Sequence, residues 1–409
     1  MDHLLERFLR YVKVDTKAVE QTDAYPSSPG QLELGKMLAG ELKELKLENV
    51  QIDENGLVWA DIPATCDSAP RIAWFAHMDT SPEFTATGVK PVVHEEYDGQ
   101  DIVLPGDPSR VIGVDDCEVL SSFKGKTLIT TDGTTLLGAD DKCGVAVIMT
   151  AADELMKNRD IKHGPIRILF TCDEEVGRGA DKIDVEKVHA VCGYTLDGET
   201  IGELDHETFS ADLAVVTVTG RNIHPGLATG KMVNAIRVAS LFISKMPWEK
   251  LSPEATSGMD GFLHPYQMEG GVDQVTLRII LRSFNTDQLE DQANLLRDIA
   301  KSIVADHPKA KIDVAVSKQY RNMKDTMAKE PRAVELAAQA MRNAGFDPQY
   351  KSIRGGTDGS RLSEMGLPTP NLPVGMHNFH SPLEFACLDE MRDSVRILLE
   401  LAKLWGNEK

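Results

Sequence analysis

The sequence lacks the features that mark secreted and membrane-spanning proteins. Its six cysteines form no C-x-x-C pair, so we expect reduced thiols instead of a disulfide framework or a zinc knuckle. It contains no run of about 18 apolar residues, the minimum for a membrane-spanning helix. Residues 1–9 alternate apolar and charged side chains, whereas a signal peptide has an uninterrupted apolar core. We therefore expect a cytoplasmic protein.

Basic side chains are in deficit. The chain has 44 lysines and arginines against 64 aspartates and glutamates, which gives a net charge of −20. A surface that follows a phosphate backbone needs the opposite sign, so nucleic acid is not an expected partner. The acidity favours solubility, and bound cations would neutralise part of it.

The length of the chain predicts more than one domain. Its 409 residues exceed the roughly 250–300 at which a single hydrophobic core usually stops growing. With 42% hydrophobic and 26% charged residues, the composition is that of an ordinary globular protein.

The first half alternates strand-like and helix-like segments. Residues 32–47 and 145–156 have helical spacing of apolar side chains. Short apolar runs typical of buried strands occupy Ile72–Ala76, Thr127–Thr130, Ile166–Thr171 and Val191–Thr195. This alternation predicts an α/β fold, a mostly parallel sheet with helices on both faces. Ligands collect at the carboxyl ends of the strands in such sheets.

A different pattern begins near residue 209. Its strand-like and helix-like segments follow the ferredoxin-like order β-α-β-β-α-β: Leu213–Thr219, Asn234–Lys245, 266–270, Thr276–Phe284, Asp287–Ala305 and Ile312–Val316. Helices at Arg332–Asn343 and Glu390–Trp405 then resume the α/β pattern. We expect a discontinuous catalytic domain of residues 1–208 and 323–409. The inserted α+β domain, residues 209–322, would act as a substrate-binding lid or in dimerisation.

Five acidic or histidine-bearing segments follow strand-like runs. They contain enough imidazoles and carboxylates to hold two divalent cations: 76–79, 138–142, 173–175, 196–198 and 377–380. We therefore treat them as a candidate metal centre.

Most of these residues also have a simpler interpretation. His77 is either a buried hydrogen-bonded histidine or a metal ligand whose other ring nitrogen is held by Asp79, two residues on. Of Asp140 and Asp141, which open a helix, one could cap the helix while the other binds metal. Asp197 alone could be an ordinary turn aspartate.

The run Asp173-Glu174-Glu175 differs from the usual solvated acidic face, because it ends an apolar strand. Three adjacent carboxylates repel one another unless cations or protons compensate them, so we favour a metal ligand beside a general base. His377 and His380 lie in one loop, and the residues alone do not decide between them; either could be a surface histidine.

Four motifs resemble the M20 metallopeptidase family: Ala76-His77-Met78-Asp79-Thr80-Ser81-Pro82, Leu137-Gly138-Ala139-Asp140-Asp141-Lys142, Asp173-Glu174-Glu175-Val176-Gly177 and Arg354-Gly355-Gly356-Thr357-Asp358-Gly359. Together with Asn222-Ile223-His224-Pro225-Gly226, the length and domain order are similar in particular to its tripeptide aminopeptidases. The resemblance extends over essentially the whole chain.

The resemblance implies a role for each candidate residue. The ligands of two zinc ions, for which manganese or cobalt could substitute, would be His77, Asp140, Glu175, Asp197 and His380, with Asp140 bridging the two ions. Asp79 would orient His77, and Glu174 would be the general base. The substrate would contact His224, Arg282 and Arg354, although a surface ion pair is an equally simple role for either arginine.

The implied activity is release of the N-terminal residue from tripeptides, so the expected partners are short peptides, with a homodimer left open. Binding residues on both domains would require domain closure. Two alternatives stay open. One is another M20 activity, a carboxypeptidase or a deacylase of N-acyl amino acids; the other is a metal-binding protein without catalysis.

Overall fold

The computed structural model describes residues 3–409, so Met1 and Asp2, which begin the segment of alternating apolar and charged side chains, lie outside the described part. The chain divides into two compact units. The first comprises the chain up to His206 together with residues 323–351 and 357–409, and the second comprises residues 207–322 and 352–356. Within residues 3–409, no helix combines the length and apolarity that crossing a bilayer requires.

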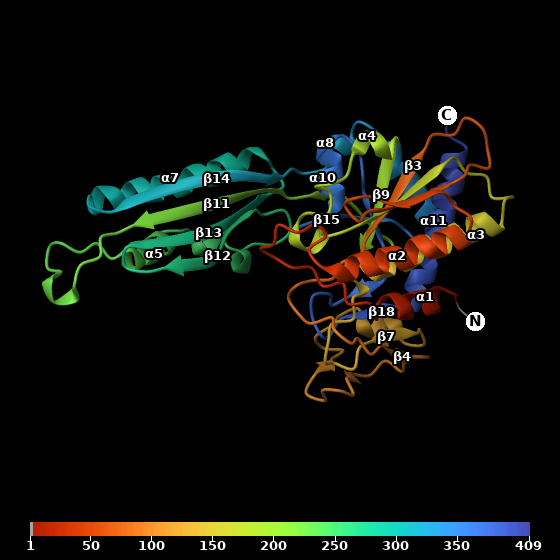
Figure 1. Cartoon of the computed structure of the whole chain (residues 1–409), viewed down its shortest axis with the longest axis horizontal. Coiled ribbons are helices and arrows are strands. Elements are labelled where there is room, and N and C mark those ends of the chain that lie inside the picture. Colours follow the sequence, from red (N-terminus) through yellow and green to blue (C-terminus); the bar gives the residue numbers. More distant parts are fainter. Residues whose placement is uncertain (1–2) are drawn as a thin grey trace. The chain divides into compact units, whose positions relative to one another are not determined.

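An eight-stranded sheet forms the centre of the first unit (Figure 1). Its strands in spatial order are β1 (Glu48–Ile52), β2 (Val58–Ile62), β8 (Ile166–Thr171), β3 (Ile72–His77), β9 (Cys192–Gly198), β16 (Asn371–Pro373), β10 (Glu203–Thr208) and β15 (Gln349–Ile353). The pairs β8–β3, β3–β9 and β9–β16 are parallel, whereas β1–β2, β2–β8 and β16–β10 are antiparallel. The prediction of an α/β fold with a parallel sheet is confirmed for its central strands.

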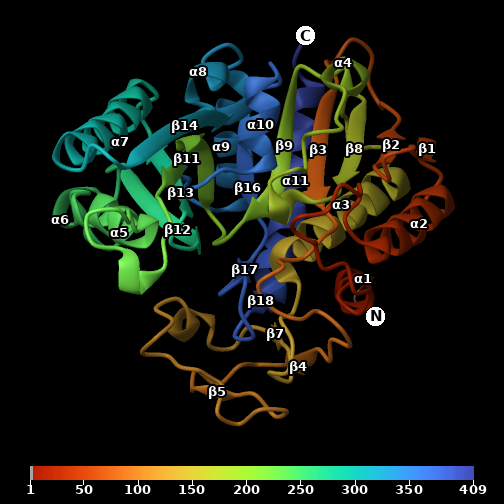
Figure 2. The ribbon, with the colours of Figure 1, turned by 60° about the vertical axis from the view of Figure 1, so that its left-hand side comes forward.

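The central strands β3, β8 and β9 are mostly apolar, as expected of strands that are covered on both faces. The Tyr194 hydroxyl donates to the Ala333 carbonyl and accepts from Trp405 Nε1, which places α9 (Arg332–Ala344) and α11 (Leu388–Gly406) on one face. The next residue, Thr195, lies against Gly359 of α10 (Asp358–Glu364). Since neighbouring strand residues point to opposite faces, α10 covers the other face (Figure 2).

The remaining helices of the first unit include both predicted ones. They are α1 (His3–Tyr11), α2 (Pro29–Glu44), α3 (Ala139–Lys157), α4 (Val185–Val188) and α8 (Lys324–Met327). The helix predicted at 145–156 thus begins earlier, at the acidic turn. α3 packs against β3 and β9, and α2 packs against β1 and β2.

The strand predicted at Thr127–Thr130 was assigned to the wrong sheet. It is β7 (Leu128–Thr130), which pairs antiparallel with β4 (Val92–His94) and β18 (Phe385–Cys387) in a separate four-stranded sheet completed by β17 (Met376–His377). A further hairpin pairs β5 (Ile102–Val103) with β6 (Val111–Ile112). Strands of two or three residues are too short to show a period, so sequence patterning does not reveal these sheets.

The second unit has the predicted β-α-β-β-α-β order. Its elements are β11 (Ser210–Thr219), α5 (Ala235–Ser244), β12 (Phe262–Gly270), β13 (Gln274–Ser283), α7 (Asp287–Asp306) and β14 (Lys311–Tyr320), with the short helix α6 (Trp248–Leu251) after α5. The antiparallel strand order β12-β13-β11-β14 is that of a ferredoxin-like sheet. α5 and α7 contact each other and enclose one hydrophobic core against the sheet.

Candidate metal centre

The five predicted ligand side chains meet at the carboxyl ends of the central strands of the first unit. His77 ends β3, and Asp197 lies near the end of β9. Glu175 lies in a 3-10 turn (Glu174–Val176) directly after β8, Asp140 opens α3, and His380 lies in the loop between β17 and β18. Parallel strands bring their carboxyl ends to one edge of the sheet, which explains how His77, Glu175 and Asp197 converge.

The Asp140 carboxylate lies between the two imidazoles. Asp140 Oδ1 is 2.9 Å from His77 Nε2, which is also 3.7 Å from Asp197 Oδ1. Asp140 Oδ2 is 3.4 Å from His380 Nε2, which is 2.8 Å from Glu175 Oε2. One carboxylate thus presents one oxygen to each half of the cluster.

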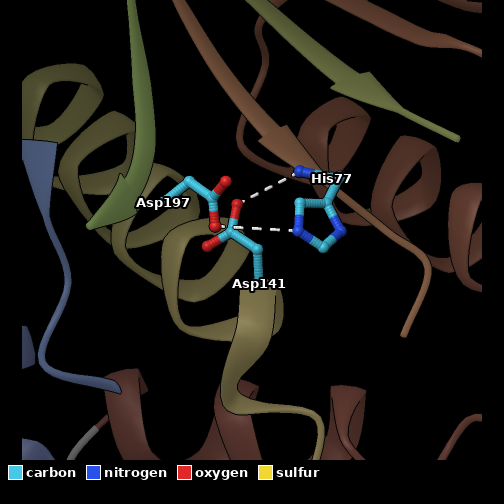
Figure 3. Close-up of side chains that lie close together, drawn as sticks. All are labelled: His77, Asp141 and Asp197. Atoms are coloured by element: carbon cyan, nitrogen blue, oxygen red, sulfur yellow. Dashed lines mark hydrogen bonds and ion pairs between the residues drawn. The ribbon is translucent and has the colours of Figure 1, made fainter. Parts of the chain in front are cut away.

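The neighbouring Asp141 has a different role. Figure 3 shows its carboxylate beside His77 and Asp197. A ring nitrogen of His77 and one carboxylate oxygen from each aspartate all lie within 4.8 Å of one another. However, Asp141 Oδ2 accepts the backbone N–H of His77 and Oδ1 accepts that of Gly144, at 3.1 Å each. Asp141 therefore caps α3 and holds the end of β3, and of the two aspartates Asp140 is the better placed for a cation.

Asp79 makes its main contacts away from His77. Its two carboxylate oxygens accept the backbone N–H groups of Glu174 and Glu175, at 3.1 and 3.0 Å. His77 Nδ1 is 3.2 Å from the Asp79 backbone oxygen and 3.5 Å from its carboxylate. The Asp79 backbone oxygen is thus the nearer acceptor for the His77 imidazole, and the Asp79 carboxylate is the more distant one.

Asp173 is fully buried and points away from the other two acidic residues. Its carboxylate accepts hydrogen bonds from Ser27 and from Gln31 Nε2 (2.7 Å), and it pairs with Arg178 Nη2 at 2.6 Å. Arg178 supplies the positive charge that three successive carboxylates need. The backbone of the 173–175 turn is therefore held by Asp173 on one side and by Asp79 on the other.

Two residues that position the site were missed by sequence reasoning. The Asn371 Oδ1 atom accepts the backbone N–H of Asp197 at 3.1 Å, and its Nδ2 donates to Asp205. Glu384 accepts backbone N–H groups of the turn that contains Asp140. Neither belongs to an acidic run or a periodic pattern, so the sequence contains no signal for them.

The electrostatics of the cluster favour positive charge. Burial, followed by the charge of Asp140, raises the pKa of Glu175 to about 8 and that of Asp197 to about 7. Burial also raises the pKa of Glu174 well above its usual value, with further contributions from neighbouring carboxylates. Burial opposes charge on His77, but hydrogen bonds to Asp140 and other aspartates outweigh it and raise the imidazole pKa. Such a set holds protons unless cations replace them.

The donor set fits divalent cations. Glu175 Oε1 is buried and has no hydrogen-bond partner within the described part of the chain, a costly state for a carboxylate oxygen. Two imidazoles and three carboxylates, without a thiolate, are ligands typical of catalytic zinc and also suit manganese or cobalt.

The two histidines of the 377–380 loop are clearly separated. His377 is fully buried outside the cluster, where its Nε2 is 2.9 Å from Glu390 Oε2 and its ring stacks on Phe385. His380 is the one that reaches Asp140 and Glu175.

The three predicted substrate-binding residues all lie in the second unit. His224 is exposed, and its Nδ1 accepts the backbone N–H of Gly226. Arg282 donates to Gln319 Oε1 at 3.0 Å and lies over the Tyr320 ring. Arg354 is held by backbone carbonyls of the 256–260 loop and lies over two phenylalanine rings.

Comparison with known proteins identifies close relatives over the full length. Residues 122–404 match the model of Peptidase family M20/M25/M40. The chain is 45% identical over 403 residues to Peptidase T of Geobacillus thermodenitrificans, with 98% of each chain covered. Among solved structures, aminopeptidase PepT of Bacillus cereus (TM-score 0.77, 27% identity) and a tripeptidase of Staphylococcus aureus Mu50 (TM-score 0.79, 25% identity) each align over 99% of this chain and 98% of their own.

The contacts of Asp173 predict a large effect on stability. Asp173→Asn takes the charge from a fully buried acceptor that pairs with half-buried Arg178. It also turns one of its oxygens into a donor that faces the N–H groups of Ser27 and Gln31, so the free energy of unfolding should fall by about 1–3 kcal/mol. Urea unfolding followed by far-UV circular dichroism measures this change. The matched control is Asp298→Asn, whose exposed pair with Lys301 should contribute less than about 1 kcal/mol. Equal effects of the two substitutions would contradict the assigned role of Asp173.

Proposed function

The chain belongs to peptidase family M20/M25/M40 and is a peptide hydrolase, and on this premise we propose that it is a dinuclear metallo-aminopeptidase that releases the N-terminal residue of tripeptides. Relatives named Peptidase T, aminopeptidase and tripeptidase support this substrate class. One cation would be held by His77, Asp140 and Asp197, and the other by Asp140, Glu175 and His380.

The observation on which the proposal rests is the contrast between Glu174 and Glu175. The Glu175 carboxylate faces His380 at 2.8 Å, whereas the Glu174 carboxylate makes no hydrogen bond or ion pair with any residue between 3 and 409. A metal-binding protein without catalysis has no use for a free carboxylate at this position. A hydrolase needs one as its base.

We propose that the side chains divide the reaction as follows. Two bound divalent cations, zinc or its substitutes manganese and cobalt, would lower the pKa of a shared water and polarise the peptide carbonyl. Glu174 would accept a proton from the attacking water and return it to the departing amine. Its raised pKa, caused first by burial, favours holding that proton between the two steps. The Asp79 carboxylate accepts the backbone N–H groups of Glu174 and Glu175 and so fixes the backbone from which both side chains project.

Substrate binding is proposed for the second unit. A peptide carboxylate is recognised best by a bidentate guanidinium, which Arg282 or Arg354 could provide, and His224 could stabilise the tetrahedral oxyanion. The Arg354 side chain is already held by three residues of the 256–260 loop, so Arg282 is the stronger candidate for the carboxylate.

The first test compares a free tripeptide with its N-acetylated form. An aminopeptidase should cleave the free peptide and reject the acetylated one, and a chelator should abolish cleavage until zinc or cobalt is restored. Product analysis by mass spectrometry identifies the residue released. Preferred cleavage of the acetylated peptide would instead favour the deacylase alternative, and full activity of metal-free protein would contradict the dinuclear site.

The second test addresses Glu174. Glu174→Gln should retain two cations per chain but lose about 10²–10⁴-fold in kcat, the usual contribution of a general base. Metal content by mass spectrometry and turnover are measured on the same sample. Glu186→Gln, an exposed residue of α4, is the control and should behave as the parent protein. Near-normal turnover of Glu174→Gln would remove Glu174 as the base.

The third test addresses the carboxylate of the substrate. Amidation of the tripeptide C-terminus should lower kcat/KM by about 10–100-fold, the equivalent of a charged hydrogen bond worth about 1.5–3 kcal/mol. Arg282→Gln should remove this difference between acid and amide. Arg278→Gln, four residues away on the same face of β13, is the control and should preserve it. Equal rates for acid and amide with the parent protein would exclude an arginine clamp.

A further inference from the structure

Glu384 is a buried acid whose partners are all backbone amides of the Asp140 turn. Its side chain is 1% exposed. Oε2 accepts the N–H groups of Leu137 and Gly138, both at 2.7 Å, and Oε1 accepts that of Asp140 at 3.0 Å. A carboxylate that accepts several backbone N–H groups fixes the segment that supplies them, because each would otherwise be a buried donor without a partner.

Glu384 also lies four residues after His380, in the same loop. This loop is closed by its own hydrogen bonds: Ser381 Oγ donates to the Asn378 carbonyl at 2.8 Å, and the Glu384 N–H donates to the Ser381 carbonyl at 3.2 Å. These two hydrogen bonds link Glu384 to the loop residues on either side of His380. Through one side chain, the segment that contains His380 is joined to the turn that contains Asp140.

The other half of the cluster is held by different groups. Asp141 holds the backbone of His77, and Asn371 holds that of Asp197. Glu384 has no hydrogen bond to any of these residues within the described part of the chain. The loss of the Glu384 carboxylate should therefore displace two of the three residues proposed for one cation, Asp140 and His380, but only Asp140 among those proposed for the other.

We propose that Glu384 is a positioning residue that sets the separation of Asp140 and His380, and that the cation held by Asp140, Glu175 and His380 depends on it more strongly than the cation held by His77, Asp140 and Asp197. This inference rests on the proposed two-cation function. Groups that orient ligands without touching the cation typically change metal affinity by about 10–100-fold when they are lost.

The test is a zinc competition titration of Glu384→Gln against a chromophoric chelator. The amide preserves the size of the side chain but turns one acceptor into a donor that faces a backbone N–H. The parent protein should bind two equivalents of zinc. The variant should bind one equivalent with the smaller loss of affinity and the second about 10–100-fold more weakly than the parent. Excess zinc should restore most of its tripeptidase activity.

The matched control is Glu390→Gln, six residues further along. Glu390 is equally buried, but its carboxylate pairs with His377 and lies outside the cluster, so both equivalents should bind as in the parent. If Glu390→Gln weakens the second equivalent as much as Glu384→Gln does, the effect comes from general loosening of the C-terminal segment and the proposal is wrong.

A second variant covers a failure to fold, which far-UV circular dichroism would reveal. Glu384→Asp keeps the charge and shortens the side chain by one methylene, and it should also weaken the second equivalent. If a folded variant binds both equivalents like the parent, the role of Glu384 is refuted while the proposed function stands. If the parent itself binds fewer than two equivalents, the dinuclear function fails independently of Glu384.

Discussion

The structure of the candidate site depends on one recurring interaction, a buried carboxylate that accepts backbone N–H groups from a neighbouring segment. Asp79, at the end of β3, accepts the N–H groups of Glu174 and Glu175 after β8. Asp141 holds β3 in the same way. Chain segments at a sheet edge leave donors that no ladder satisfies, and a carboxylate satisfies two or three of them at once. The backbone of His77, Glu174 and Glu175 is thereby fixed, and this fixes where their side chains begin.

This arrangement explains how so many acidic residues fit into one buried region. A carboxylate surrounded by N–H donors has a local compensation for its charge and adds little repulsion to its neighbours. The charge of Asp173 is compensated in addition by the Arg178 guanidinium, whose Nη2 lies 2.6 Å from Asp173 Oδ2. Burial nevertheless raises the pKa of Glu175 to about 8 and that of Asp197 to about 7. It also raises the pKa of Glu384 to about 7, although its backbone N–H donors lower it. The buried carboxylates around the cluster therefore still need external positive charge.

The sequence predicts the elements that have a period of their own. β3 and β8 are continuous apolar runs, and α2 and the β-α-β-β-α-β order of the second unit follow from spacing. The strands of two or three residues around β7 lack such a period, and β7 was therefore assigned to the wrong sheet. The positions of Asn371 and Glu384 also lie beyond the reach of spacing, because their partners are amides more than 170 residues away in the chain.

Adjacent acidic residues illustrate the same limit most directly. Residues 140 and 141 are both aspartates, and residues 174 and 175 are both glutamates, so the sequence offers two equivalent carboxylates in each pair. The fold makes them unequal. Asp141 is occupied by two backbone N–H groups, which leaves Asp140 to face both imidazoles. Glu175 faces His380, which leaves Glu174 free. In each pair, the contacts of one residue differ from those of its neighbour. The two identical side chains therefore have different roles.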